Sequence, residues 1–210
     1  MFFSRSIVDK YVCTLFLQLA RDFPDLATPI ARIVEDARKI EAELLPTYTL
    51  AHGDYHPGQV HVGSDRHWLL DLDHLWRRDP AYDLAMAVVK LRGLVTRRGA
   101  DGPYRELLEA FLESYLASMD DEIAQRVPIN AALIFLKRAC KRFHYRDEPD
   151  WPAAIHHQIS RAEECLAVHE SRRQGRGLSA ALENCLRCPG ATGDREAQLL
   201  GRAEARARAG

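Results

Sequence analysis

HGDYHPGQ at residues 52–59 and LDLD at residues 70–73 are the stretches that decide the fold of this chain. The first stretch concentrates glycine, proline and polar residues, which predicts a loop. Short β-prone runs follow at Val60–Val62 and His67–Leu70, and four residues separate them. This spacing predicts a β-hairpin that places Asp71 at the end of a strand and close to the loop.

Carboxylates and a carboxamide gather in these stretches, at Asp54, Gln59 and Asp71. Phosphoryl transfer to a hydroxyl group needs an aspartate directed at the attacking oxygen, and further side-chain oxygens that hold Mg2+ against the nucleotide phosphates. Asp54 suits the first task, and Gln59 and Asp71 suit the second. Taken alone, His52–Asp54 is equally typical of a capped turn in which an aspartate bonds to backbone amides.

The loop resembles the HGDxxxxN catalytic loop of aminoglycoside phosphotransferases and choline kinases, and Leu70–Asp73 resembles their metal-binding strand. A third block, Arg78–Ala85 with the sequence RDPAYDLA, is similar to the GDPxYDLA helix start that follows in the same family. Three blocks in the same order make the match specific. The resemblance extends more loosely to about His169.

This resemblance implies a role for each polar residue of the two stretches. Asp54 would be the catalytic base, and His52 would orient the loop by hydrogen bonding. Gln59 and Asp71 would bind the cofactor as Mg2+ ligands, with Asp73 as an auxiliary acidic residue near the metal. The implied reaction transfers the γ-phosphate of ATP, or another NTP, to a hydroxyl of a small molecule such as a sugar, an amino alcohol or an aminoglycoside.

Three positions leave alternatives open. Gln59 stands where the family usually has asparagine, and it places the carbonyl oxygen one methylene farther from the backbone. Members that resemble maltokinases also carry glutamine at this position. Arg78 replaces the family's glycine, which affects the local turn. Asp73 could cap the following loop or pair with Arg77 instead of serving a metal.

Apolar residues recur at helical spacing along six segments. Thr28-Pro29 predicts the start of the second helix and Asp79-Pro80 that of the third, because a capping residue before proline is typical of a first turn. Asp83 suits the helix dipole there and could bond back to the loop. The segments are Val8 to Leu19, Ile30 to Leu44, Leu84 to Leu91, Tyr104 to Tyr115, Ile129 to Phe143 and Ile155 to Leu166. The predicted fold is α+β, a mainly helical lobe like the C-terminal lobe of protein kinases with a small β-hairpin.

Family members place a β-rich nucleotide-binding lobe, with a lysine and a glycine-containing loop, ahead of the catalytic loop. Only 51 residues precede His52, and helical patterns occupy them. Lys10 and Lys39 both lack glycine-rich neighbours. We therefore expect the N-terminal nucleotide lobe to be missing, so that either a separate chain supplies it or the protein is a catalytically inactive binding module.

Five histidines leave a metal-dependent hydrolase as a further alternative, although none shows the paired spacing of zinc ligands on one helix. They are His52, His56, His61, His67 and His74. Cys185 and Cys188 form a lone C-x-x-C pair, which indicates zinc only weakly without a second pair.

Charge and composition favour a cytoplasmic protein without a nucleic-acid or membrane partner. The 29 lysines and arginines nearly balance the 30 aspartates and glutamates, so no overall field attracts an anionic surface. Five scattered cysteines are typical of a reducing compartment. No apolar stretch approaches the roughly 20 residues of a membrane helix. We expect a phosphotransferase lobe at residues 1–170 and a poorly ordered tail, rich in Arg, Ala and Gly, at residues 171–210.

Overall fold

The computed structural model describes residues 14–44, 48–98, 103–118, 120–146 and 149–173. These ranges contain six α-helices, two 3-10 turns and four strands of three residues each. In chain order the elements are α2 (Thr14–Asp22), α3 (Pro24–Glu43), β1 (Thr49–Ala51), η1 (Pro57–Gln59), β2 (Val60–Val62), β3 (His67–Leu69), η2 (Leu72–His74), β4 (Trp76–Arg78), α4 (Ala81–Arg98), α5 (Pro103–Ala117), α6 (Asp121–Tyr145) and α7 (Trp151–Arg173). The mainly helical α+β prediction is confirmed.

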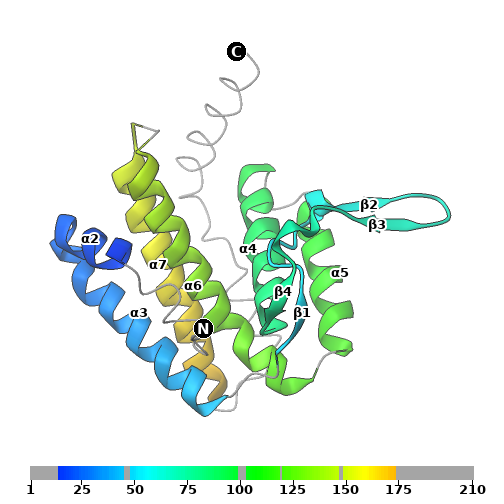
Figure 1. Cartoon of the computed structure of the whole chain (residues 1–210), viewed down its shortest axis with the longest axis horizontal. Coiled ribbons are helices and arrows are strands. Elements are labelled where there is room, and N and C mark those ends of the chain that lie inside the picture. The colour runs from blue at the N-terminus through cyan, green and yellow to red at the C-terminus, as the bar shows by residue number, and fades with distance from the viewer. Residues whose placement is uncertain (1–13, 45–47, 99–102, 119, 147–148, 174–210) are drawn as a thin grey trace.

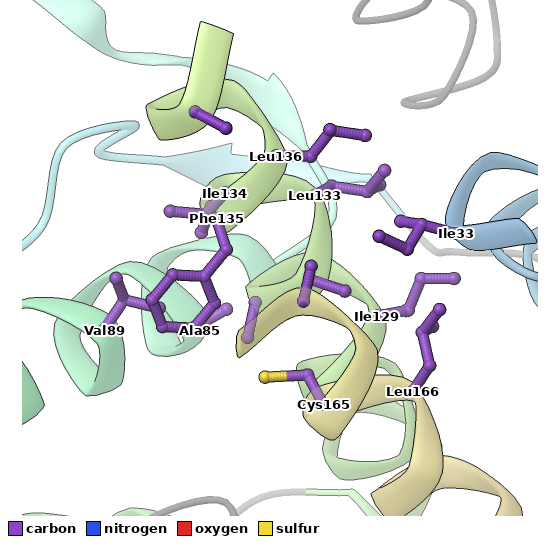
Figure 2. Close-up of a cluster of buried hydrophobic side chains, with 14 of the residues drawn as sticks. Ile33, Ala85, Val89, Ile129, Leu133, Ile134, Phe135, Leu136, Cys165 and Leu166 are labelled. Atoms are coloured by element: carbon purple, nitrogen blue, oxygen red, sulfur yellow. The ribbon is translucent and has the colours of Figure 1, made fainter. Parts of the chain in front are cut away.

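The two longest helices, α6 and α7, lie side by side at the centre of the fold (Figure 1). Helices α2 and α3 pack on one side of this pair, and α4, α5 and the strands lie on the other. Figure 2 shows apolar side chains from α3, α4, α6 and α7 that belong to one buried cluster, among them Ile33, Val89, Leu133 and Leu166. Burying one such side chain contributes about 1.5–3 kcal/mol, so this core fixes α4 against α6.

The strands form two separate antiparallel pairs, β1 with β4 and β2 with β3. The hairpin expected at Val60–Val62 and His67–Leu70 is confirmed, with Val60 opposite Leu69, and it projects away from the helices (Figure 1). The sequence predicted this hairpin alone, and the structure adds a second pair, because Trp76–Arg78 forms a strand that pairs with β1. Its WRR sequence has no alternation of apolar and polar residues, so only the pairing makes it a strand.

The predicted start of the second long helix at Thr28-Pro29 is also wrong. Helix α3 begins at Pro24, and Pro29 lies inside it. A proline removes the hydrogen bond to the carbonyl four residues earlier, here that of the exposed Asp25, which water can solvate. The second turn of α3 therefore tolerates this proline.

Several expectations fall on residues outside the described ranges. The first predicted helix is confirmed from Thr14 onward, while its expected start near Val8 is not described. The Cys185 and Cys188 pair and the tail beyond residue 173 are likewise not described. Within the described ranges, no helix has the length and apolar character needed to cross a bilayer.

Candidate active site

The backbone of the HGD loop, His52–Gln59, is fixed by Asp83 in the first turn of α4. The amide nitrogen of His52 donates to Asp83 Oδ2 at 2.6 Å, and that of Gly53 donates to Asp83 Oδ1 at 2.8 Å. The bond from Asp83 back to the loop that the sequence suggested is therefore present. Hydrogen bonds to a carboxylate are about twice as strong as neutral ones, so α4 holds the loop firmly.

His52 ties the HGD loop to the end of β3. Its ring is buried, its Nε2 lies 2.8 Å from the carbonyl oxygen of Leu70, and its Nδ1 lies 3.4 Å from the amide nitrogen of Asp54. These partners select the tautomer in which Nε2 carries the hydrogen and Nδ1 accepts. The His52 ring thus connects Leu70, which precedes Asp71, with the backbone of Asp54.

Position 53 requires glycine because the 3-10 turn η2 lies close to its backbone. Its φ is +86°, and a Cβ added there would lie 2.5 Å from the carbonyl oxygen of His74. Any other residue would meet both a strained backbone and a steric clash. The same added atom would lie 3.3 Å from Cζ of Arg78, the residue that replaces the family's glycine. Arg78 occupies strand β4 and not a turn, and its guanidinium stacks on the ring of Tyr82.

The Asp54 carboxylate lies between a histidine and a lysine. His56 Nε2 is 3.8 Å from Asp54 Oδ2, and Lys90 Nζ is 3.9 Å from Asp54 Oδ1. Burial and, next, the charge of Lys90 lower the pKa of His56 below its ordinary value, so its ring is neutral at pH 7. Sequence reasoning missed Lys90, although it follows Asp83 by seven residues, two helical turns, and so shares its face of α4.

Gln59 and Asp71 meet directly at the base of the hairpin. Gln59 Nε2 lies 2.9 Å from Asp71 Oδ2, and the amide of Leu70 donates to the Gln59 carbonyl at 2.8 Å. Asp71 has a φ of +57°, a left-handed conformation that is uncommon for residues other than glycine and that clusters at functional sites. The two residues that sequence reasoning assigned to metal binding are therefore neighbours.

Asp73 lies in η2 and is exposed. The ion pair with Arg77 that was one of its alternatives is not formed, because Arg77 Nη2 points to the carbonyl oxygen of Tyr48 at 3.5 Å. Among the described residues, no three His, Cys, Asp or Glu side chains gather closely enough to hold a metal ion by themselves. The role of Asp73 near a metal stays a prediction.

Helix α6 contributes two buried polar residues that sequence reasoning also missed. Arg126 Nε lies 3.0 Å and Asn130 Nδ2 lies 3.1 Å from Asp79 Oδ2. The other oxygen of Asp79 accepts the amide of Ala81 at 3.0 Å, so Asp79 caps α4 as predicted. The apolar stripe of α6 gave no signal of this pairing, because the partner lies 47 residues earlier in the chain.

Aromatic side chains connect α5 with the HGD loop. The ring centroids of Tyr55 and Phe111 are 6.3 Å apart, and those of Phe111 and Tyr115 are 5.6 Å apart. Burial and then the negative charge of Asp83 raise the pKa of both tyrosines. The two hydroxyls thus remain protonated at neutral pH and can act as hydrogen-bond donors near the loop.

Comparison with known proteins agrees with this geometry. The sequence profile of the family APH, described as the phosphotransferase enzyme family, matches residues 11–124. That span includes the HGD loop, the hairpin and the start of α4. No curated protein matches the chain. Because the profile covers more than half of the 210 residues, the chain belongs to the APH phosphotransferase family.

Proposed function

We propose that this protein is an ATP-dependent kinase that phosphorylates a hydroxyl group of a small molecule such as a sugar, an amino alcohol or an aminoglycoside. The observation that carries the proposal is the contact between Gln59 and Asp71. These residues are twelve positions apart, yet they meet beside a loop whose backbone α4 holds in place. Two metal-competent side chains and a fixed aspartate are the parts that phosphoryl transfer requires of this lobe.

Asp54 is the proposed base. Its carboxylate is partly exposed and can meet a substrate hydroxyl, while the backbone on its N-terminal side is held by Asp83. As the acceptor oxygen bonds to the γ-phosphorus, the bond to the β-phosphate oxygen breaks, and the hydroxyl proton passes to Asp54. The fixed loop would keep that carboxylate directed at the acceptor, and general-base assistance of this kind contributes roughly 10²–10⁴-fold.

Gln59 and Asp71 fit a magnesium ion. Mg2+ is usually bound through one or two carboxylates together with substrate phosphates, and the Asp71 carboxylate with the Gln59 carboxamide supplies such a set. When bound, the ion would neutralise charge on the phosphates. The longer glutamine side chain reaches Asp71 directly, so the replacement of the family's asparagine keeps the two groups together.

Lys90 is proposed to assist at the same place. Its ammonium group lies beside Asp54, so it stands where negative charge gathers on a phosphoryl group during transfer. His56 is neutral, and its Nδ1 accepts a hydrogen bond from the amide of Gly58, which holds the loop in shape. Lys90 is therefore the positive side chain that this lobe itself brings to Asp54.

The nucleotide clamp is proposed to come from polypeptide outside the described ranges, either another segment or a separate chain. The described residues before β1 form helices α2 and α3, which pack near α6 and α7 and not around the HGD loop. Exposed large apolar side chains of the described part concentrate near the loop and hairpin, which supports a docking surface there. Those near the loop and hairpin are Leu50, Val62, Trp68, Leu69, Leu70, Leu72, Leu75 and Trp76, while Leu17, Leu107 and Tyr145 lie on the helices.

Consumption of ATP with Mg2+ tests the proposal, measured across a panel of sugars, amino alcohols and aminoglycosides. The chain is assayed alone and with the polypeptide encoded next to its gene. Asp54→Ala should abolish acceptor-dependent consumption, and Asp65→Ala, at the exposed hairpin turn, is the matched control. Consumption that survives Asp54→Ala unchanged would overturn the mechanism. No acceptor-dependent consumption under any condition would favour an inactive binding module.

A further inference from the structure

Two carboxylates with different partners stand at the start of α4. Asp79 caps the helix by accepting the amide of Ala81, and Asp83 lies in its first turn. Asp83 accepts the amides of His52 and Gly53, whereas Asp79 is bound by α6. A displacement of Asp79 would therefore be carried along the helix to Asp83 and then to the HGD loop.

From this chain of contacts, we propose that Arg126 and Asn130 on α6 are positioning residues for the HGD loop. They fix Asp79, which fixes the first turn of α4, and Asp83 in that turn fixes the backbone before Asp54. The catalytic meaning of this positioning rests on the proposed function. Both residues lie beyond residue 124, where the family match ends, so the match assigns them no role.

The burial of these groups makes the contact costly to lose. The Arg126 and Asp79 side chains are 5% and 2% exposed, and Asn130 is 1% exposed. Removing one partner of a buried ion pair leaves an uncompensated charge that must find water or other partners. Asp79 can find water only by leaving its place at the start of α4, which would also remove its cap on Ala81.

The hydrogen bonding of the two α6 residues is directed at Asp79. Arg126 donates from Nε to Asp79 Oδ2 and from Nη1 to the carbonyl oxygen of Glu122, so these two bonds fix the orientation of its guanidinium group. Asn130 donates to Asp79 and to the carbonyl oxygen of Arg126, while its own Oδ1 is buried without a partner in the described part of the chain. A buried unsatisfied oxygen is destabilising, and the donor contact to Asp79 gives a reason to keep the asparagine.

Native-state amide hydrogen exchange of the full chain tests the proposal without any enzymatic turnover. Arg126→Met keeps the length of the side chain and removes its charge and donors, and Asn130→Ala is a milder variant. The double variant Asp79→Asn, Arg126→Met removes both charges and keeps a capping oxygen at position 79. Leu136→Ala, in the core of the same helix, is the matched control for general destabilisation.

We expect the amides of His52 and Gly53 to exchange about tenfold faster or more in Arg126→Met and Asn130→Ala, beyond any change in global stability measured by urea unfolding. The double variant should restore much of their protection relative to Arg126→Met. In Leu136→Ala these two amides should keep their local protection. The proposal is wrong if the exchange rates of the His52 and Gly53 amides change only in proportion to global stability in every variant. It is also wrong if these amides exchange faster in the double variant than in Arg126→Met.

An active preparation adds a second readout. Arg126→Lys keeps the charge but not the fork, so we expect kcat to fall while the KM for ATP stays within about twofold. Absence of kinase activity in the wild-type protein would count against the proposed function alone, because the exchange experiment decides the positioning role independently. Equal changes in kcat and in the KM for ATP would contradict positioning of the base.

Discussion

Asp83 Oδ2 lies 2.6 Å from the amide nitrogen of His52, which comes 31 residues earlier in the chain. The other oxygen of the same carboxylate accepts the next amide, that of Gly53. One side chain at the start of α4 thus determines the path of the HGD loop just before Asp54. The fold and the candidate chemistry depend on each other at this contact.

Asp83→Asn should loosen the loop, because the amides of His52 and Gly53 donate to separate oxygens and the NH2 group of asparagine would face one of them. Loss of one hydrogen bond to a charged group costs about 1.5–3 kcal/mol. We expect a decrease of this size in the free energy of unfolding measured with urea, together with a large loss of acceptor-dependent ATP consumption. Asp121→Asn, in the exposed first turn of α6, is the control and should leave both quantities nearly unchanged.

Gln59→Asn restores the residue that the family usually has, but it shortens the side chain by one methylene. The shorter amide should lose its contact with Asp71, so that Mg2+ is held less well with ATP present. We expect the Mg2+ concentration at half-saturation to rise on the order of tenfold. Gln18→Asn, at an exposed position of α2, should not change this Mg2+ concentration. An unchanged Mg2+ dependence would show that the glutamine contact has no part in metal binding.

Lys90→Met should raise the pKa of His56 toward its ordinary value, because the charge of Lys90 is the second largest of the causes that lower it. Burial, the largest cause, and the charge of His52 would remain, so the pKa of His56 should not pass its ordinary value. Titration of the imidazole signals by NMR measures this change. Lys39→Met removes a lysine that pairs with Glu35 on α3 and should leave the His56 titration as in the wild type.

The contact between α3 and α7 should depend on pH through His156. Its Nδ1 bonds to the carbonyl oxygen of Pro152 and its Nε2 lies 2.7 Å from Asp25, and these bonds raise the pKa of His156 above 6.5. The stabilisation is complete below about pH 6 and is lost as the pH rises through the raised pKa. Urea unfolding between about pH 6 and pH 9 should show a decrease in stability that His156→Gln removes. A stability that rises with pH over this range and is unaffected by His156→Gln would contradict the assignment.

The parts of the fold that the sequence predicted are those with local signals. The four residues between Val62 and His67 predicted the hairpin, and Asp79-Pro80 predicted the start of α4. The place of Asp83 in the predicted first turn of α4 also suggested a bond back to the loop. Each of these signals comes from residues close together in the chain.

The features that sequence reasoning missed depend on contacts between distant segments. Strand β4 exists because Trp76–Arg78 pairs with β1, and its own sequence lacks the alternation of apolar and polar residues that predicts a strand. Arg126 and Asn130 sit on a helix whose apolar stripe explains its packing but not its link to Asp79. Lys90 becomes part of the candidate site only when α4 lies against the HGD loop.

In the proposed reaction, Asp54 takes the proton of a hydroxyl that receives the γ-phosphate of ATP. The most direct measurement is 31P NMR detection of a new phosphate ester on an acceptor from the panel, with Mg2+ and ATP present. We predict that the wild-type protein and Asp65→Ala form the ester, and that Asp54→Ala forms it roughly 10²–10⁴-fold more slowly. Ester formation by Asp54→Ala at the wild-type rate would exclude Asp54 as the base.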